Sequence, residues 1–177
     1  IGRLIPQIVY YFHSYSVLVN RGEIKLGDQV NFTVPSGNFG DCLAGWIAKN
    51  MGLPVNKFIV ASNKNNILTD FFKTGVYDTH REFYKTNAPA MDILVSSNLE
   101  RLVWFMVDGN SEKVDQFYKS LSDEGVYRVD EETLARIQKE FVAGCQSEEQ
   151  VLENIKDCYD KTHYLLDTHT AVGYGVY

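Results

Sequence analysis

The feature that most constrains the fold is the order of patterns between residues 29 and 62. A β-branched and aromatic run over 29–34 ends at Pro35 and leads into the glycine-bearing sequence Ser36-Gly37-Asn38-Phe39-Gly40. Apolar residues then recur at helical spacing, at Leu43, Trp46, Ile47 and Met51. The nearly all-apolar run 57–62 follows, which is typical of a strand buried on both faces of a parallel sheet. This order predicts a βαβ unit with a right-handed crossover, and therefore an α/β fold.

The loop between the first strand and the helix has the composition of a phosphate-binding site. Gly37 and Gly40 carry no Cβ, so that the main chain can come close to an anion. The helix expected over 39–51 adds a partial positive charge at its N-terminus, and Ser36 and Asn38 add side-chain donors. The loop also lies beyond the carboxyl end of a strand, where open α/β sheets bind their ligands.

Two common phosphate-binding motifs do not fit this loop. A Walker loop needs a Lys-Ser or Lys-Thr pair after its last glycine, and a dinucleotide fingerprint needs a third glycine at a fixed spacing. Residues 35–41 contain neither feature. A tight turn that only caps the helix remains an alternative on spacing alone, because short glycine motifs are weak signals.

The elements outside the βαβ unit are expected to be mostly helical. A helix over 4–19 precedes it, with a buried face made of Ile5, Ile8, Val9, Phe12 and Val19. A helix from Asn66, which can cap it, extends to Gly75, and residues 77–84 are typical of a surface loop. Residues 126–129 are expected to form a short extra strand.

Four helices are expected in the second half of the chain. The apolar residues of the first three are Leu99, Leu102, Val103 and Met106, then Val114, Phe117, Tyr118 and Leu121, then Leu134, Ile137 and Phe141. The sequence Ser147-Glu148-Glu149-Gln150 predicts a capping box for the fourth, which would bury Val151, Leu152, Ile155 and Cys158. We therefore expect a parallel sheet flanked by helices in one unit, 1–177, with a phosphate-loop part over 1–85 and a mainly helical part over 86–177.

Charge and cysteine content restrict the partners. The formal net charge of −6 and the lack of a basic run argue against nucleic acid and against an anionic membrane surface. No apolar stretch approaches the ~20 residues that a membrane-spanning helix needs. The cysteines Cys42, Cys145 and Cys158 have no metal-type spacing, and we expect free thiols, no metal site and a cytoplasmic protein.

The exact residues of the loop resemble those of a known family. Residues 34–41, followed by Ala44-Gly45 and Ala48-Lys49, are similar to the phosphate loop of threonine synthases, which are fold-type-II pyridoxal phosphate enzymes with a tryptophan-synthase-β-like fold. The Gly-Asn-Phe-Gly sequence favours this family over cysteine and tryptophan synthases, whose glycine loops differ. Further similar blocks follow in the family's order along nearly the whole chain, at 1–4, 6–7, 10–12, 52–54, 61–63, 66–71, 89–93 and 169–173.

The resemblance implies a function for a longer parent enzyme. The parent would be a pyridoxal-phosphate-dependent lyase of threonine biosynthesis that converts O-phospho-L-homoserine and water into L-threonine and phosphate. The cofactor would act as an electron sink, with its phosphate bound by Ser36, Gly37, Asn38, Phe39 and Gly40. The parent is expected to be a monomer or a homodimer. The start at Ile1 and the end at Tyr177, without helix-ending signals, also predict an excerpt.

The resemblance also implies that the catalytic lysine lies elsewhere. In the family, a lysine in a Phe-Lys-Asp context forms the Schiff base, and this sequence contains no such context. Lys73 is the nearest imitation, but a lysine near a helix end is normally a solvated charge, and a nucleophilic lysine needs a lowered pKa. No catalytic residue is therefore assigned here, and the segment alone is expected to be inactive.

Two further residues are candidates for substrate contact. Arg3 can face a substrate phosphate, because the guanidinium group matches phosphate geometry, although a solvated arginine is the simpler interpretation. Asn63, at the carboxyl end of the second strand, can line the cleft or form a turn. The competing functions for the chain are a non-catalytic module that binds another phosphorylated ligand or anion, and a silent relative that keeps only the scaffold.

Overall fold

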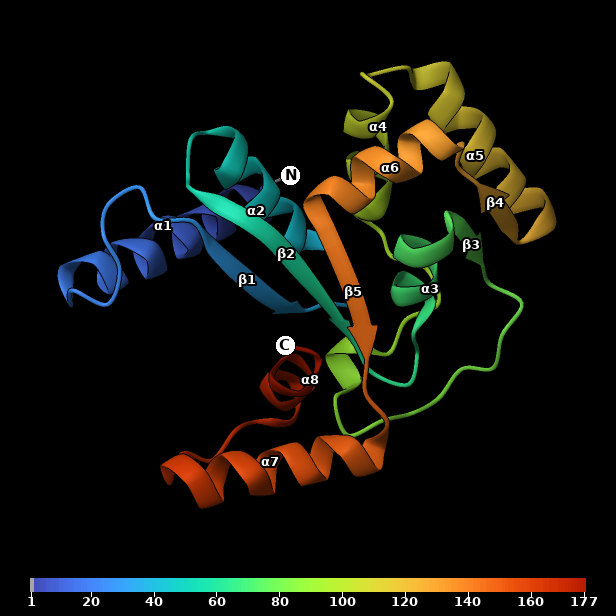
Figure 1. Cartoon of the computed structure of the whole chain (residues 1–177). Helices are drawn as coiled ribbons and strands as arrows, with labels where there is room; N and C mark the ends of the chain where they lie inside the picture. The colour runs from blue at the N-terminus through green and yellow to red at the C-terminus, as the bar shows by residue number, and fades with distance from the viewer. Residues whose placement is uncertain (1) are drawn as a thin grey trace.

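A parallel sheet lies at the centre of the computed structural model, which describes residues 2–177. Its strands are β1 (Val30–Pro35), β2 (Val55–Ser62) and β5 (Phe141–Cys145), in the order β1-β2-β5. Both neighbours run parallel to the central strand β2 (Figure 1). The predicted α/β fold with a parallel sheet is therefore confirmed, although Ile1, which begins the block 1–4, lies outside the described residues.

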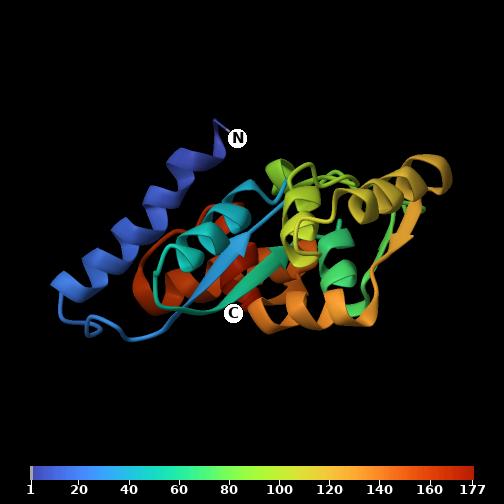
Figure 2. The ribbon, with the colours of Figure 1, turned by 90° about the horizontal axis from the view of Figure 1, so that it is seen from above.

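Helices and one small antiparallel sheet of two strands accompany this sheet. In chain order, the remaining elements are α1 (Leu4–Asn20), α2 (Gly40–Asn50), α3 (Ile67–Thr74), β3 (Val76–Asp78), the 3-10 turn η1 (Pro89–Met91), α4 (Leu99–Met106), α5 (Ser111–Glu124), β4 (Val126–Arg128), α6 (Glu131–Glu140), α7 (Glu148–Thr162) and α8 (Thr168–Val176). Figure 2 shows α1 at one end of the molecule and the antiparallel pair β3–β4 near the other. The predicted βαβ unit is formed by β1, α2 and β2.

The two faces of the sheet pack against different sets of helices. Val60 on β2 belongs to the larger core, which also takes buried residues from α1, α2, α3, α4 and α6. The next residue, Ala61, belongs to a second core with Val151 of α7 and Val172 of α8. Successive side chains of a strand point to opposite faces, so both faces of β2 are covered. This accounts for the almost entirely apolar run at 57–62.

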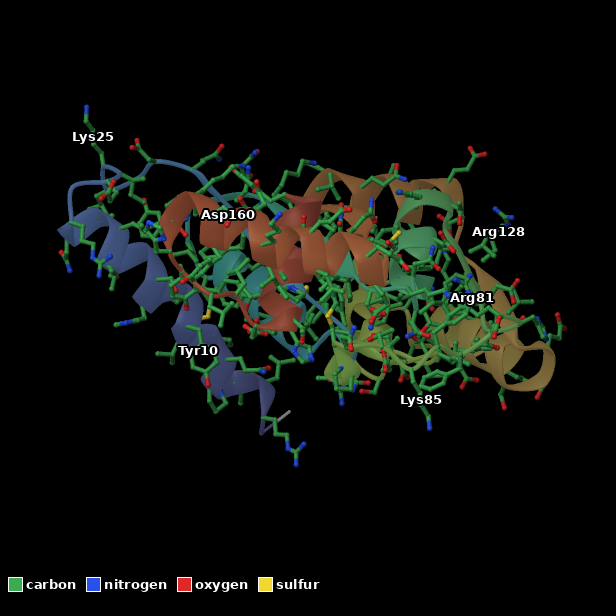
Figure 3. The ribbon with its side chains drawn as sticks, turned by 90° about the horizontal axis from the view of Figure 1, so that it is seen from below. Tyr10, Lys25, Arg81, Lys85, Arg128 and Asp160 are labelled. Carbon is green, nitrogen blue, oxygen red and sulfur yellow. The ribbon has the colours of Figure 1, made fainter. Side chains whose placement is uncertain are left out.

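The predicted buried face of α1 is only partly correct. Ile5 and Val9 are 58% and 61% exposed, whereas Tyr11 and Tyr15 are buried. The Tyr11 ring packs edge-on against Phe32 of β1, with a centroid separation of 4.8 Å. The side of α1 that faces the core therefore carries Leu4 and the two tyrosines, while Ile5 and Val9 face outward. Figure 3 labels Tyr10, which is 60% exposed on α1.

The assignment of Phe141 to a helix is wrong. Helix α6 ends at Glu140, and Phe141 begins β5, where it lies opposite Phe58 of β2. Phe141 is 1% exposed and packs near Phe58 with a ring separation of 5.5 Å. Because Phe141 lies four residues after Ile137, it satisfies helical spacing as well. Helix α8 is a further element that the apolar pattern does not predict, although Asp167 caps it through its side chain.

The caps and turns confirm some local predictions and contradict others. The capping box at Ser147 is confirmed, because Ser147 and Gln150 bond reciprocally, but Leu152 of α7 is 56% exposed. The short strand near 126–129 is confirmed as β4. Asn66 makes no capping bond to α3, since its Oδ1 accepts from Arg81, and β3 occupies the start of the loop expected over 77–84.

No helix among residues 2–177 is long and apolar enough to cross a membrane. Cys42, Cys145 and Cys158 are free thiols, as expected.

The contact between α1 and α2 predicts a sensitive glycine. A Cβ added at Gly45 would lie 2.5 Å from two ring carbons of Tyr11 and 2.7 Å from Phe58. We expect Gly45→Ala to lower the free energy of unfolding by about 1–3 kcal/mol through overpacking, despite the better helix propensity of alanine. Urea denaturation measures this change. Gly2→Ala is the control, because its Cβ would meet nothing within 4 Å, and an equally stable Gly45→Ala variant would contradict the close packing.

Candidate functional site

The loop between β1 and α2 lies at the carboxyl end of the sheet. Pro35 is paired with Ala61 at the end of the β1–β2 ladder, and the Ser36 amide donates to the Ala61 carbonyl at 2.9 Å. The chain then leaves the sheet and enters α2 at Gly40. This is the position at which the sequence pattern predicts a ligand.

The main-chain amides of the loop are free to bind an anion. Among residues 2–177, the amides of Gly37, Asn38, Phe39 and Gly40 form no hydrogen bond with the protein. No side chain caps α2 either, whereas α7 has a complete capping box. The unpaired amides and the helix dipole together favour negative charge at this end of α2.

Phe39 gives the loop its turn. Its φ of 62° places it in the left-handed region, which costs a non-glycine residue roughly 1 kcal/mol. Its side chain is 1% exposed and packs near Phe72 and Phe141, with ring separations of 5.6 and 5.7 Å. Burial of the ring therefore offsets the backbone strain and holds the loop in one conformation.

The two glycines of the loop have different roles. A Cβ at Gly37 would lie 2.9 Å from the Ala90 carbonyl oxygen and 3.1 Å from the Met91 Cα. The space beside Gly37 is therefore filled by the η1 main chain, and not left open for an anion as expected from the sequence. A Cβ at Gly40 would lie 3.4 Å from Asn98 Nδ2 and Gln7 Oε1. Both of these residues line a cavity at the loop.

A cavity of about 650 Å³ opens at the loop. Its lining contains all five predicted phosphate-binding residues, from Ser36 to Gly40, together with Arg3. Arg3 is the one cation among the lining residues that the structure describes. The sequence pattern did not identify the other polar lining residues, Gln7, Ser97 and Asn98, although the Ser-Ser-Asn run before α4 is a signal of side-chain donors.

An acidic group accompanies this cavity. Asp41, in the first turn of α2, lines the cavity, and its Oδ1 is buried without a partner among residues 2–177. Burial raises the pKa of the Asp41 carboxyl above its ordinary value, although the nearby Tyr11 hydroxyl opposes the shift.

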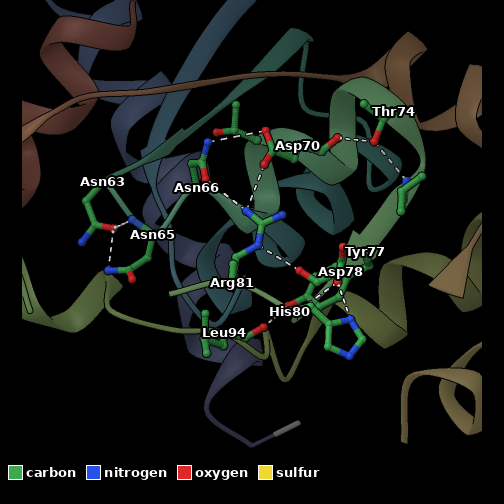
Figure 4. A network of polar contacts seen from close by, with 12 residues as sticks. Asn63, Asn65, Asn66, Asp70, Thr74, Tyr77, Asp78, His80, Arg81 and Leu94 are labelled. Atoms are coloured by element: carbon green, nitrogen blue, oxygen red, sulfur yellow. Dashed lines mark hydrogen bonds and ion pairs between the residues drawn. The ribbon is translucent and has the colours of Figure 1, made fainter. Parts of the chain in front are cut away.

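Asn63 lies apart from the other predicted residues. It is completely buried, and its Nδ2 donates to Thr86 Oγ1 at 2.8 Å and to Asp92 Oδ1 at 2.7 Å. Its Oδ1 accepts from the Asn65 amide at 2.9 Å (Figure 4). Asn63 is absent from the lining of the loop cavity, and its hydrogen bonds are made within the protein. A substrate contact by Asn63 stays a prediction.

Asp92 is the centre of this partly buried network. Its carboxylate accepts from Asn63, from Asn65 Nδ2 at 3.0 Å, and from the amide and hydroxyl of Thr86 at 3.0 and 2.8 Å. Asp92 follows η1 directly, so these bonds fix the turn that fills the space beside Gly37. No group of His, Cys, Asp and Glu residues suited to a metal ion occurs within 2–177.

Comparison with known proteins finds similar chains and folds. The human protein "Threonine synthase-like 1" is 42% identical over 172 residues, which cover 97% of this chain and 23% of that protein. Threonine synthase of Saccharomyces cerevisiae is 41% identical over 185 residues, covering 97% of this chain and 35% of that protein. The chain thus spans between about a quarter and about a third of these curated relatives. No family model matches it.

A solved structure extends the similarity to the fold. The crystal structure of PLP-bound threonine synthase from Brucella melitensis matches this chain with a TM-score of 0.93 and 38% identity. The match covers 98% of this chain and 36% of that one.

The packing behind the loop predicts the reactivity of the thiols. Cys42 follows the loop in α2 and is fully buried, Cys158 is also buried, and Cys145 is exposed. Burial also raises the pKa of the Cys42 thiol, which suppresses the reactive thiolate. We expect an Ellman assay on this chain to detect one fast thiol in the native state and three after denaturation. Cys145→Ser should remove the fast reaction, and a fast reaction of Cys42 would show that the region behind the loop is open.

Proposed function

We propose, from the premise that this chain corresponds to a segment of the threonine synthases, that its loop binds the phosphate of pyridoxal phosphate in a longer enzyme. The observation that carries the proposal is the set of unpaired amides from Gly37 to Gly40 at the edge of the cavity. The PLP-bound relative from Brucella melitensis supports it, because its fold matches nearly all of this chain.

The residues present fit a phosphate group. Four main-chain donors precede or begin α2, and Ser36 and Asn38 lie in the same stretch. The helix N-terminus attracts negative charge. The phosphate would therefore be held mainly by backbone groups, whose positions do not depend on flexible side chains.

The proposed reaction of the whole enzyme is the conversion of O-phospho-L-homoserine and water into L-threonine and phosphate. When bound, the cofactor supplies an electron sink for carbanions. This chain would bind and orient the cofactor at its phosphate end. Ser36, Gly37, Asn38, Phe39 and Gly40 are the proposed cofactor-binding residues.

Arg3 is the proposed contact for the substrate phosphate. It lines the same cavity as the loop and is exposed, so that its side chain is accessible to an anionic ligand. A guanidinium group can bind a phosphate through two parallel hydrogen bonds. The unpaired amides and the Arg3 cation would then serve two different phosphates, one of the cofactor and one of the substrate.

The segment alone is proposed to be catalytically inactive. Lys73 lies at the last turn of α3 with an exposed side chain, outside the residues that line the loop cavity. It is therefore a poor substitute for a Schiff-base lysine. We further propose that the whole enzyme is a cytoplasmic lyase of threonine biosynthesis and that it is a monomer or a homodimer. Its proposed partner is a small-molecule substrate, and neither nucleic acid nor a membrane is expected as a partner.

A cofactor-binding experiment tests the proposed function. We expect pyridoxal phosphate to give a visible absorbance band with the longer protein in which the flanking sequence is restored. Gly40→Val should weaken this band strongly, because the new side chain would enter the cavity near Gln7 and Asn98. Gly37→Val should abolish it, since the Cβ alone would collide with the η1 main chain. Absorbance titration with the cofactor measures both effects.

A matched control and an assay separate the competing functions. Gln116→Leu places a bulky side chain on the exposed face of α5 and should leave the titration unchanged. If the unmodified longer protein gives no band, the cofactor proposal fails and the result favours a module that binds another phosphorylated ligand or anion. If it binds the cofactor but forms no threonine from O-phospho-L-homoserine, it is a silent relative.

A further inference from the structure

The segment between η1 and α4 forms hydrogen bonds with two main-chain carbonyls of the loop 36–40. Ser96 Oγ donates to the Gly37 carbonyl at 2.8 Å. The amide of Asn98 and its Nδ2 both donate to the Asn38 carbonyl, at 3.1 and 2.8 Å. Both of these loop carbonyls are therefore occupied by a segment that lies much further along the chain. We call Ser96 and Asn98 the carbonyl clamp.

The carbonyl clamp determines where the loop amides point. In a trans peptide, the C=O of one residue and the N–H of the next point in opposite directions, and the described chain has no cis peptide. Fixing the Gly37 carbonyl toward Ser96 therefore turns the Asn38 amide away from Ser96. Fixing the Asn38 carbonyl toward Asn98 turns the Phe39 amide away in the same manner. These two amides are among those without a protein acceptor in residues 2–177.

The clamp itself is held by buried groups. Ser96 is 2% exposed, and its amide donates to the Tyr77 hydroxyl at 2.8 Å. Tyr77 in turn donates to the Leu94 carbonyl at 3.1 Å and stacks on Tyr127 with a ring separation of 5.4 Å. The position of Ser96 is thus set by the aromatic residues of the antiparallel pair β3–β4.

Asn98 is oriented by a charged neighbour. Arg101 Nη1 donates to Asn98 Oδ1 at 2.6 Å, within the start of α4. This bond settles which end of the Asn98 amide faces the loop, because the oxygen is taken by Arg101 and the nitrogen is left to donate to Asn38. Both clamp residues direct their side-chain donors to loop carbonyls, so each acts through the loop backbone.

We propose that Ser96 and Asn98 are positioning residues that preorganise the loop amides for phosphate. The proposal rests on the proposed function, since it takes the cofactor phosphate as the ligand. Without the clamp, the peptide groups after Gly37 and Asn38 can rotate, and a rotated carbonyl would present negative charge to the anion. When the clamp holds these peptides in place before binding, the ligand does not have to order them. The entropy cost of that ordering is then absent from the binding free energy.

The test compares ligands with and without phosphate. We expect Ser96→Ala and Asn98→Ala in the longer protein each to raise the Kd of pyridoxal phosphate about tenfold, the size of one lost hydrogen bond. The Kd of pyridoxal, which lacks the phosphate, should change less than about twofold, because its binding does not use the loop amides. Absorbance or fluorescence titration gives both constants, and the ratio of the two is the readout that a general loss of structure would not move.

A matched variant controls for lost stability. Ser120 Oγ donates to the Val126 carbonyl at 2.7 Å, which is the same kind of bond as that of Ser96 but lies outside the loop and its cavity. We expect both Ser120→Ala and Ser96→Ala to lower the thermal midpoint. Ser120→Ala should not change the ratio of the two Kd values. The conservative variant Ser96→Thr keeps a hydroxyl donor and should recover part of the phosphate preference.

The outcomes separate the two proposals. If the unmodified protein binds neither ligand, the proposed cofactor site fails and the clamp has no role at it. If the unmodified protein prefers pyridoxal phosphate, but Ser96→Ala and Asn98→Ala weaken both ligands equally, the clamp proposal is overturned and the residues only stabilise the fold. A loss of phosphate preference in Ser120→Ala would also overturn it, because the effect would then follow stability alone.

Discussion

The packing of the buried Phe39 ring is the interaction on which the conformation of the loop and its connection to α2 and the sheet depend. Its left-handed backbone turns the chain from β1 into α2, and its contacts with Phe72 and Phe141 hold that turn in place. Those two rings come from α3 and β5, so the loop conformation is fixed by elements far along the chain. A glycine at this position would relieve the strain but lose the anchor. The site is therefore rigid because its most strained residue is also one of its most buried.

The β1–α2–β2 unit could be predicted because local patterns there agree with the tertiary structure. The run before Pro35, the glycine loop and the following apolar stripe each specify one element, and all three occur in the expected order. Strand β5 could not be assigned, since Phe141 satisfies helical spacing from Ile137 and only its pairing with Phe58 decides otherwise. Helix α8 contains Gly173 and Gly175, which disfavour a helix, and Gly173 packs against Pro35 instead.

The main-chain chemistry of the site could be predicted, but its surroundings could not. The free amides follow from glycines between a strand and a helix, and the sequence pattern locates them correctly. Gly37 is needed for a reason other than the one expected from the sequence. Its missing side chain makes room for the η1 main chain and not for an anion. Asn63 shows why position along a strand is not enough for a functional assignment. A polar residue at a strand end has the same sequence pattern whether it faces a cleft or, as here, bonds the partly buried carboxylate of Asp92. Contacts between distant segments, such as that between Ser96 and Gly37, leave no mark in local spacing.

The late position of β5 in the chain has a consequence for folding kinetics. Phe58 is joined to Phe141, far along the chain, whereas β1 and β2 are linked by the short crossover through α2. Closing the longer loop costs more entropy, about 0.6 kcal/mol for each doubling of its length, before any pairing repays it. The β1–α2–β2 unit should therefore form early and the third strand dock afterwards. Because the Phe141 ring packs on Phe39, the loop 36–40 should acquire its final shape only in that last step.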